Sequence, residues 1–169
     1  PVVDLPGVFV LGREDRILHS AIHLFHDGEL PHGLRDLSDL DLLLTDPANP
    51  GDFWPHLLAR ARELKQERPL YYALRYARHF LATPVPDAAW QALAVAAPHG
   101  LRLRLADSVF RRALAPNHSG CDDRWSDLAR LAVYVRAHWL RMPAHLLLPH
   151  LFHKAFISPW LDRETARPA

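Results

Sequence analysis

The stretch RDLSDLDLLL, Arg35 to Leu44, decides between two kinds of fold. In a β-strand alternate side chains point the same way, so Asp39 and Asp41 would form a carboxylate pair able to hold catalytic Mg²⁺. In an α-helix the leucines would share one face, with the aspartates largely outside it. Those leucines are Leu37, Leu40, Leu43 and Leu44.

The sequence upstream of this stretch favours the helix. Such a pair resembles that of the polymerase-β-like nucleotidyltransferase fold, in which a Gly-Ser turn at a helix N-terminus, about a dozen residues earlier, cradles the phosphate. The preceding residues here read HLFHDGELPHG and contain no Gly-Ser. We therefore predict that Asp39 and Asp41 are surface groups of a helix and that Asp36 is its N-cap or lies among the leucines.

Helical spacing of apolar residues extends over most of the chain. Proline, glycine and short polar runs divide it into about seven or eight segments. We predict helices over residues 14–26, 34–44, 53–66, 69–82, 87–97, 101–115, 124–141 and, kinked at Pro149, 144–157. One valine-rich stretch, GVFVLG (Gly7–Gly12), has the composition of a strand. The predicted fold class is thus an almost all-α bundle with one short N-terminal strand.

Charge distribution, cysteine content and hydropathy indicate the cellular compartment in which the protein is expected. Net charge is +1, but residues 1–52 hold ten acids and three bases, whereas residues 53–169 hold nine acids and seventeen bases. Cys121 is the only cysteine, so no disulfide can form within the chain, which favours a reducing cytoplasm. No apolar run reaches the roughly 18 residues of a membrane span, and no signal peptide is recognisable.

A histidine stripe runs beside the apolar face of the first predicted helix. Asp15, His19, His23 and His26 fall on one side of that helix. Two histidines at i and i+4 can share a metal, but HSAIH lacks the glutamate of a metalloprotease motif. The stripe is interpreted as a semi-buried interface, as a surface that faces a substrate, or as a metal site; the substrate-facing interpretation supplies our site candidates.

The predicted helix 124–141 carries a second polar stripe. Its buried face is expected to comprise Leu128, Leu131, Ala132, Val135 and Trp139. The separate stripe comprises Arg130, Tyr134, His138 and Arg141. Such a stripe can contact phosphate groups, or it can be a solvated face with ion pairs to nearby aspartates. The following PAHLLLPHLFHKAF is amphipathic, typical of a kinked packing helix or of a peripheral membrane contact.

These residues together resemble a bacterial protein group described as uncharacterised nucleotidyltransferases. That group follows a strand with an E-D-x-x-L-H-x-x-x-H helix and then an L-R-x-L-x-D-L helix. Glu14, Asp15, Leu18, His19 and His23 match the first pattern. Leu34, Arg35, Leu37, Asp39 and Leu40 match the second. The later RPLYYALRYARHFLATPVP and YVRAHWLRMPAHLLLPHLFHKA also resemble helices of the group.

The resemblance implies that the catalytic groups lie in a different domain from these helices. In the group, the Gly-Ser turn and the metal-binding aspartates lie in an α/β domain before this strand, so no position here matches them. Residues 1–13 would then be a strand and linker from that domain, 14–160 a helical domain and 161–169 a frayed tail. The whole protein would use Mg²⁺ and a nucleoside triphosphate, with none bound to this chain, which alone would be inactive.

The expected function is therefore that of a helical half that packs on a catalytic domain of the same protein and shapes the acceptor site. Nucleic acid is not the expected partner, and the acceptor is not identified. Two alternatives stay open. The chain could be a non-catalytic helical module that binds a protein, or a metal-dependent phosphohydrolase that uses His19, His23, His26 and Asp27.

Overall fold

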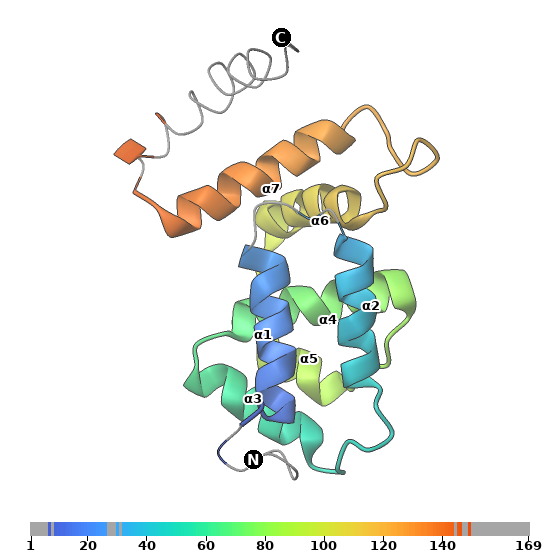
Figure 1. Ribbon diagram of the computed structural model, residues 1–169, viewed down its shortest axis with the longest axis vertical. Helices are drawn as coiled ribbons and strands as arrows, with labels where there is room; N and C mark the ends of the chain where they lie inside the picture. The colour runs from blue at the N-terminus through green and yellow to red at the C-terminus, as the bar shows by residue number, and fades with distance from the viewer. Residues whose placement is uncertain are drawn as a thin grey trace.

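The computed structural model describes residues 7, 9–26, 30, 32–143, 145–146 and 149. These residues form seven helices and no strand, which confirms the predicted fold class (Figure 1). The helices are α1 (Arg13–His26), α2 (Gly33–Leu44), α3 (Phe53–Glu63), α4 (Glu67–Leu81), α5 (Asp87–Leu93), α6 (Gly100–Leu114) and α7 (Ser126–Arg141). None of these helices is long and apolar enough to cross a membrane.

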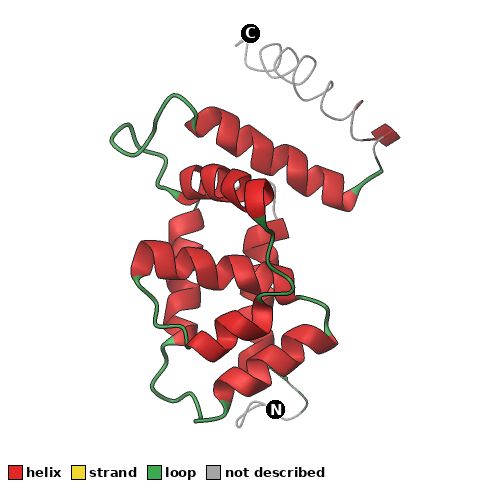
Figure 2. Ribbon diagram, turned by 180° about the vertical axis from the view of Figure 1, so that it is seen from behind, coloured by secondary structure: helices red, strands yellow, loops and turns green. Residues whose placement is uncertain are grey.

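The helices are arranged in two unequal groups. α1 and α2 lie side by side and α4 crosses both, while α3 and α5 lie at the end near the start of α1 (Figure 1). α6 and α7 pack on each other and cover the opposite end, as the view from behind also shows (Figure 2). α7 reaches α1 and α6 reaches α2, so this pair closes the end of the bundle at which α1 stops and α2 begins.

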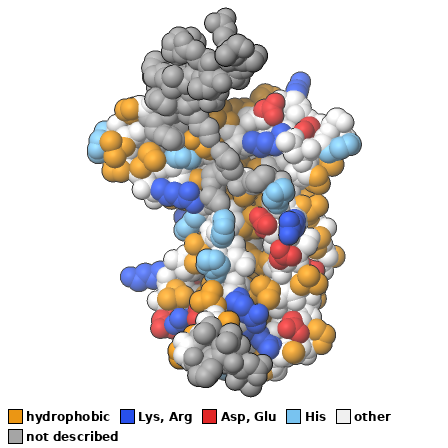
Figure 3. Space-filling model, in the orientation of Figure 1, with side chains coloured by type: hydrophobic (Ala, Val, Ile, Leu, Met, Phe, Trp, Pro, Cys, Tyr) orange, Lys and Arg blue, Asp and Glu red, His pale blue; other side chains and the backbone are white. Residues whose placement is uncertain are grey.

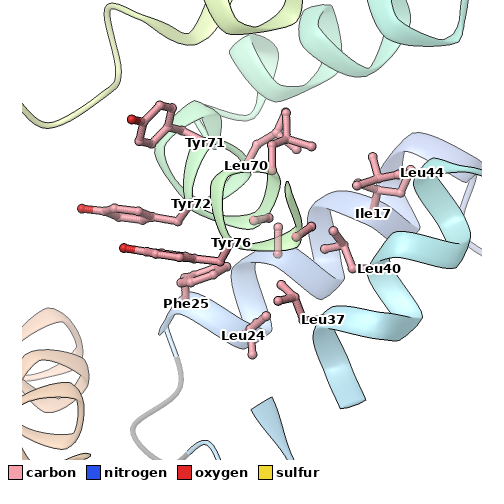
Figure 4. Close-up of a cluster of buried hydrophobic side chains, with 14 of the residues drawn as sticks. Ile17, Leu24, Phe25, Leu37, Leu40, Leu44, Leu70, Tyr71, Tyr72 and Tyr76 are labelled. Carbon is pink, nitrogen blue, oxygen red and sulfur yellow. The ribbon is translucent and has the colours of Figure 1, made fainter. Parts of the chain in front are cut away.

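The opening stretch is a helix, as predicted from its leucines. Leu37 and Leu40 are fully buried and Leu44 is nearly so, while Leu43 packs at the edge of the core. In Figure 4 the labelled leucines of α2 point toward Ile17, Leu24 and the neighbouring turns of α1 and α4. Burial of this leucine face, and not a D-x-D strand, therefore determines the structure of the segment.

Aromatic rings fill the core toward α6. The ring of Phe25 on α1 lies 5.6 Å from Tyr72, 5.8 Å from Tyr76 and 5.3 Å from Phe110, measured between centroids. Phe25, Tyr76 and Phe110 are almost completely buried. This cluster joins α1, α4 and α6, so it links the two groups of helices.

The predicted N-terminal strand is wrong over the part of it that the structure describes. Residues 9–12 have no strand hydrogen bonding, and the side chains of Phe9 and Val10 are 75% and 71% exposed. A strand requires a partner for its backbone groups, and the described residues supply none at this position. β-propensity alone therefore does not make this stretch a strand.

The predicted buried face of α7 is also wrong. Leu128, Leu131 and Trp139 are 55%, 54% and 62% exposed. The face that packs inward consists instead of Ser126, Ala129, Val133 and Ala137. Small residues let α7 approach α6 closely, so tertiary packing overrides the ranking of side chains by hydrophobicity. The predicted final segment, 144–157, lies almost wholly outside the described residues.

Several predicted boundaries shift by a few residues. α3 ends at Glu63 and α5 at Leu93, each short of the predicted end. Asp52 occupies the N-cap position of α3 but makes no capping hydrogen bond; its carboxylate lies 3.6 Å from Nε2 of His56. Pro69 falls in the first turn of α4, where its missing N–H costs no helical bond.

The left-handed backbone conformation of Ala82, at the C-terminus of α4, can be tested by mutation. This residue ends α4 in the left-handed region, with φ 58° and ψ 26°, and its side chain is exposed. Glycine adopts this conformation without a Cβ penalty, so Ala82→Gly should raise the free energy of unfolding by about 0.5–1 kcal/mol. Urea denaturation measures the change. Ala94→Gly, at an exposed position with φ −57°, is the control and should be neutral or destabilising.

Candidate functional site

A small pocket lies between α1 and α2. Its lining includes His19 and His23 from α1 and Asp36 and Asp39 from α2, and its volume is about 140 Å³. The two imidazole rings stand edge to face with centroids 6.3 Å apart. Figure 3 shows histidine side chains gathered over the viewer's side of α1, with acidic side chains beside them over α2. We refer to this feature as the α1–α2 pocket.

Helical periodicity places these four side chains together. His19 and His23 are one turn apart, as are Asp36 and Asp39. The inner faces of the two helices are held in the core by residues such as Leu18 and Leu40. Because each polar pair lies at the border of its buried face, side-by-side antiparallel packing of the two helices makes the pairs meet at the surface.

Asp15, which was predicted to share this stripe, instead forms an ion pair with a residue of another helix. Its carboxylate accepts hydrogen bonds from Nε and Nη2 of Arg60 on α3, at 2.7 and 3.3 Å. Hydrogen bonds to Asp15 and Glu63 raise the pKa of the Arg60 guanidinium above its usual value. The pair lines a separate cavity of about 340 Å³ near the start of α1. Asp15 thus fixes α1 to α3 and lies apart from the α1–α2 pocket.

His26, the last residue of the predicted stripe, lies at the other end of α1. It is half-buried, and burial followed by the positive charges of Arg136 and Arg141 lowers the pKa of its imidazole. His26 therefore belongs to the junction of α1 with α7. The structure brings together only His19 and His23 of the four predicted residues.

Arg136 was not predicted and holds this junction together. Its Nη1 donates a 2.6 Å hydrogen bond to the carbonyl oxygen of Phe25, in the last turn of α1. Its guanidinium carbon lies 5.9 Å from the ring centroid of Tyr72 and 5.4 Å from that of Phe110. Burial lowers the pKa of Arg136. A cation over aromatic faces at a helix C-terminus is favourable for stability, so its role is structural.

The predicted anion-contacting stripe of α7 is engaged in contacts within the protein. Arg130 forms ion pairs with Asp122 and, at 3.1 Å, with Asp127. The rings of Tyr134 and His138 lie 4.0 Å apart, and Nδ1 of His138 is 2.8 Å from the carbonyl oxygen of Tyr134. The positive charge of Arg141 contributes to the lowered pKa of His26. Two carboxylates already balance the charge of Arg130, so phosphate binding there would have to displace them.

Arginines also gather at a place that the sequence did not indicate. Arg104, Arg111 and Arg112 line a cavity of about 520 Å³ between α6 and the loop before α7. Arg112 is held by Asp123 at 2.9 Å, and Arg111 lies 3.7 Å from Asp107. The cavity is therefore a network of paired charges and not a uniformly positive surface.

The described residues do not fit Mg²⁺ and a triphosphate. They contain no group of three or more His, Cys, Asp or Glu side chains that could hold a metal ion. The α1–α2 pocket offers two carboxylates from one helix and two imidazoles, whereas Mg²⁺ prefers an octahedral set of oxygen ligands.

Comparison with known proteins finds a family to which the first part of the chain is similar. Residues 1–82 match the model of a family described as "Uncharacterised nucleotidyltransferase". The match includes α1 to α4, and with them the α1–α2 pocket. It confirms the resemblance that the α1 and α2 patterns predicted. No curated protein and no solved structure matches the chain.

Proposed function

From the family match over residues 1–82, we propose that this chain is the helical part of a nucleotidyltransferase and that its α1–α2 pocket faces the acceptor substrate. The observation that carries the proposal is that the matched segment brings His19, His23, Asp36 and Asp39 into one pocket. Groups that accept protons and hydrogen bonds suit the attacking hydroxyl of an acceptor.

The two kinds of side chain have different roles in this proposal. An imidazole can accept a proton near neutral pH, so His19 or His23 would deprotonate or orient the attacking hydroxyl. Asp36 and Asp39 would hold neighbouring hydroxyl or ammonium groups of the acceptor. Mg²⁺ and the nucleoside triphosphate would be held by residues outside the described part of the chain, on a catalytic domain of the same protein.

The proposal predicts a specific loss of activity. In the complete protein, the double variant His19→Ala, His23→Ala should lower acceptor turnover by about 10²–10⁴-fold, the usual contribution of general acid–base catalysis. The measurement is transfer of label from α-phosphate-labelled nucleoside triphosphates to small molecules of a cell extract, with Mg²⁺ present. His56→Ala is the matched control, because His56 is an exposed histidine on α3 outside the pocket.

Two results would contradict the proposal. Nucleotidyl transfer by the 169-residue chain alone, with ATP and Mg²⁺, would show that its own residues hold the catalytic groups. Wild-type turnover by the double histidine variant of an active complete protein would remove the α1–α2 pocket from the reaction.

The alternative of a metal-dependent phosphohydrolase has less support from the geometry. His26 lies at the α1–α7 junction and not in the pocket with His19 and His23. Asp27 lies outside the described residues. Phosphatase activity of the chain on added Mn²⁺ would favour that alternative over nucleotidyl transfer.

A further inference from the structure

The arginine-lined cavity beside α6 is rich in hydrogen-bond donors. Four of its lining residues lie on one side of α6, within about 100° of one another around the helix. They are Arg104, Ser108, Arg111 and Arg112. The loop that leads from α6 to α7 adds Cys121 and Asp123 to the lining (Figure 1). We refer to this feature as the α6 cavity.

The two carboxylates of the α6 cavity already have partners. Asp107 accepts hydrogen bonds from Nε and Nη2 of Arg75 at 2.7 and 2.6 Å. Asp123 accepts hydrogen bonds from Nε of Arg112 at 3.1 and 2.9 Å. These bonds hold both carboxylates in place, so the acceptors of the cavity wall are engaged before any ligand arrives.

The donors of the cavity, in contrast, are largely unused. Arg104 forms no hydrogen bond or ion pair with the part of the chain that the structure describes. Nη2 of Arg111 lies 3.7 Å from Oδ2 of Asp107, which is too far for a hydrogen bond. The hydroxyl oxygen of Ser108 accepts a 2.9 Å hydrogen bond from Nη1 of Arg112, so its own proton can still be donated. Two guanidinium forks and one hydroxyl are thus available to a ligand that carries acceptors.

The charges of the α6 cavity favour a ligand with two negative charges. The three arginines of the lining and Arg75 meet only the carboxylates of Asp107 and Asp123, which leaves an excess of two positive charges. A carboxylate ligand would neutralise one of them. The phosphate group of a phosphomonoester carries a charge of about −2 at pH 7 and has three terminal oxygens that accept hydrogen bonds from guanidinium forks.

The size and rigidity of the α6 cavity suit a small molecule. Its volume of about 520 Å³ is larger than a phosphate ion alone would fill and is typical of small-molecule pockets. Arg112 is fixed by Asp123 and, through Nη1, by the carbonyl oxygen of Ser108 at 2.8 Å. A wall that is already ordered loses little entropy when a ligand binds.

We propose that the α6 cavity binds a small phosphomonoester, whose phosphate group accepts hydrogen bonds from Arg104, Ser108 and Arg111. This inference goes beyond the proposed function, since it uses neither the α1–α2 pocket nor the family match. The matched residues end at position 82, before α6 begins. Failure of either proposal would therefore leave the other intact.

Calorimetric titration of the 169-residue chain with ribose 5-phosphate tests the proposal. One molecule should bind per chain, and ribose, which lacks the phosphate group, should not bind. Arg104→Gln should weaken binding at least about 10-fold, because it removes charge-assisted hydrogen bonds. Arg102→Gln is the matched control and should bind as the wild type does, since it removes the same charge from an exposed position of α6 outside the cavity lining.

Three calorimetric results would overturn the proposal. The first is the absence of binding up to about 10 mM ribose 5-phosphate, a concentration that detects even millimolar affinity. The second is binding of inorganic phosphate without binding of ribose 5-phosphate, which would assign the cavity to the free ion. The third is an equal loss of affinity in Arg102→Gln and Arg104→Gln, which would show attraction to the overall charge of α6 and not a defined site.

The thiol of Cys121 reports where the ligand binds. It is the only cysteine of the chain, it is exposed, and it lines the α6 cavity. Saturating ribose 5-phosphate should slow alkylation of Cys121 by N-ethylmaleimide at least about threefold, because the bound ligand restricts access to the thiol. At the same concentration Arg104→Gln should lose most of this protection. An unchanged alkylation rate in the wild type would place the phosphate group outside the α6 cavity and overturn the proposal.

Discussion

Phe25→Ala should lower the free energy of unfolding by about 4 kcal/mol, nearly a thousandfold in the folding equilibrium. Phe25 is 1% exposed, and its ring contacts aromatic rings of both α4 and α6. Truncation would remove the buried ring and leave a cavity between groups of helices that the Phe25 cluster joins. The cost therefore combines lost burial, lost ring contacts and incomplete collapse of the cavity.

Urea denaturation followed by circular dichroism measures this change, with the midpoint falling and the slope preserved if the transition stays two-state. Phe9→Ala is the matched control, because it deletes the same ring from a side chain that is 75% exposed. A loss below about 1 kcal/mol for Phe25→Ala would show that the cavity collapses or that the cluster is not packed as described.

Helical periodicity predicted the parts of the fold that depend on local sequence. The leucine face of α2 and the helical spacing of α1 were sufficient to predict both helices, since each face is continuous along the sequence. The sequence also identified His19 and His23 as neighbours, one turn apart. It could not identify Asp36 and Asp39 as their companions, because that contact depends on how α1 and α2 pack.

The failures have a common physical cause, which is that burial depends on partners. The stretch Gly7–Gly12 has strand composition, but its described residues have no neighbouring strand. The large apolar side chains of α7 predict a core face that the structure leaves exposed, whereas Ala129, Val133 and Ala137 are buried. Arg136 gave no signal in sequence, since its carbonyl partner at Phe25 is distant along the chain.

Asp107→Asn should lower the free energy of unfolding by about 2 kcal/mol at pH 7, the contribution of hydrogen bonds to a charged group. Asp107 on α6 accepts hydrogen bonds from Arg75 on α4 at 2.7 and 2.6 Å and from the hydroxyl of Tyr76 at 3.3 Å. Its side chain is 18% exposed and that of Arg75 is 28% exposed. Removal of the carboxylate would leave the guanidinium half-buried without its counter-charge.

The same substitution should change how stability depends on pH. The hydrogen bonds from Arg75 lower the pKa of Asp107 below the value of about 4 that aspartate has in an unfolded chain. A lowered pKa contributes stability that is present above the unfolded value and is lost as the pH falls through the folded value. The wild type should therefore lose stability below about pH 4, and its advantage over Asp107→Asn should shrink there.

Denaturation of both proteins at pH 7, 5 and 3 measures this difference, with Asp127→Asn as the control because its carboxylate is fully exposed. If the difference in the free energy of unfolding between wild type and Asp107→Asn stays constant from pH 7 to 3, the charge of the carboxylate is not what stabilises the contact. If that difference falls to zero in acid, the ion pair of Asp107 with Arg75 is what attaches α6 to α4. Since α7 rests largely on α6, acid should then loosen both helices before the leucine core of α1, α2 and α4.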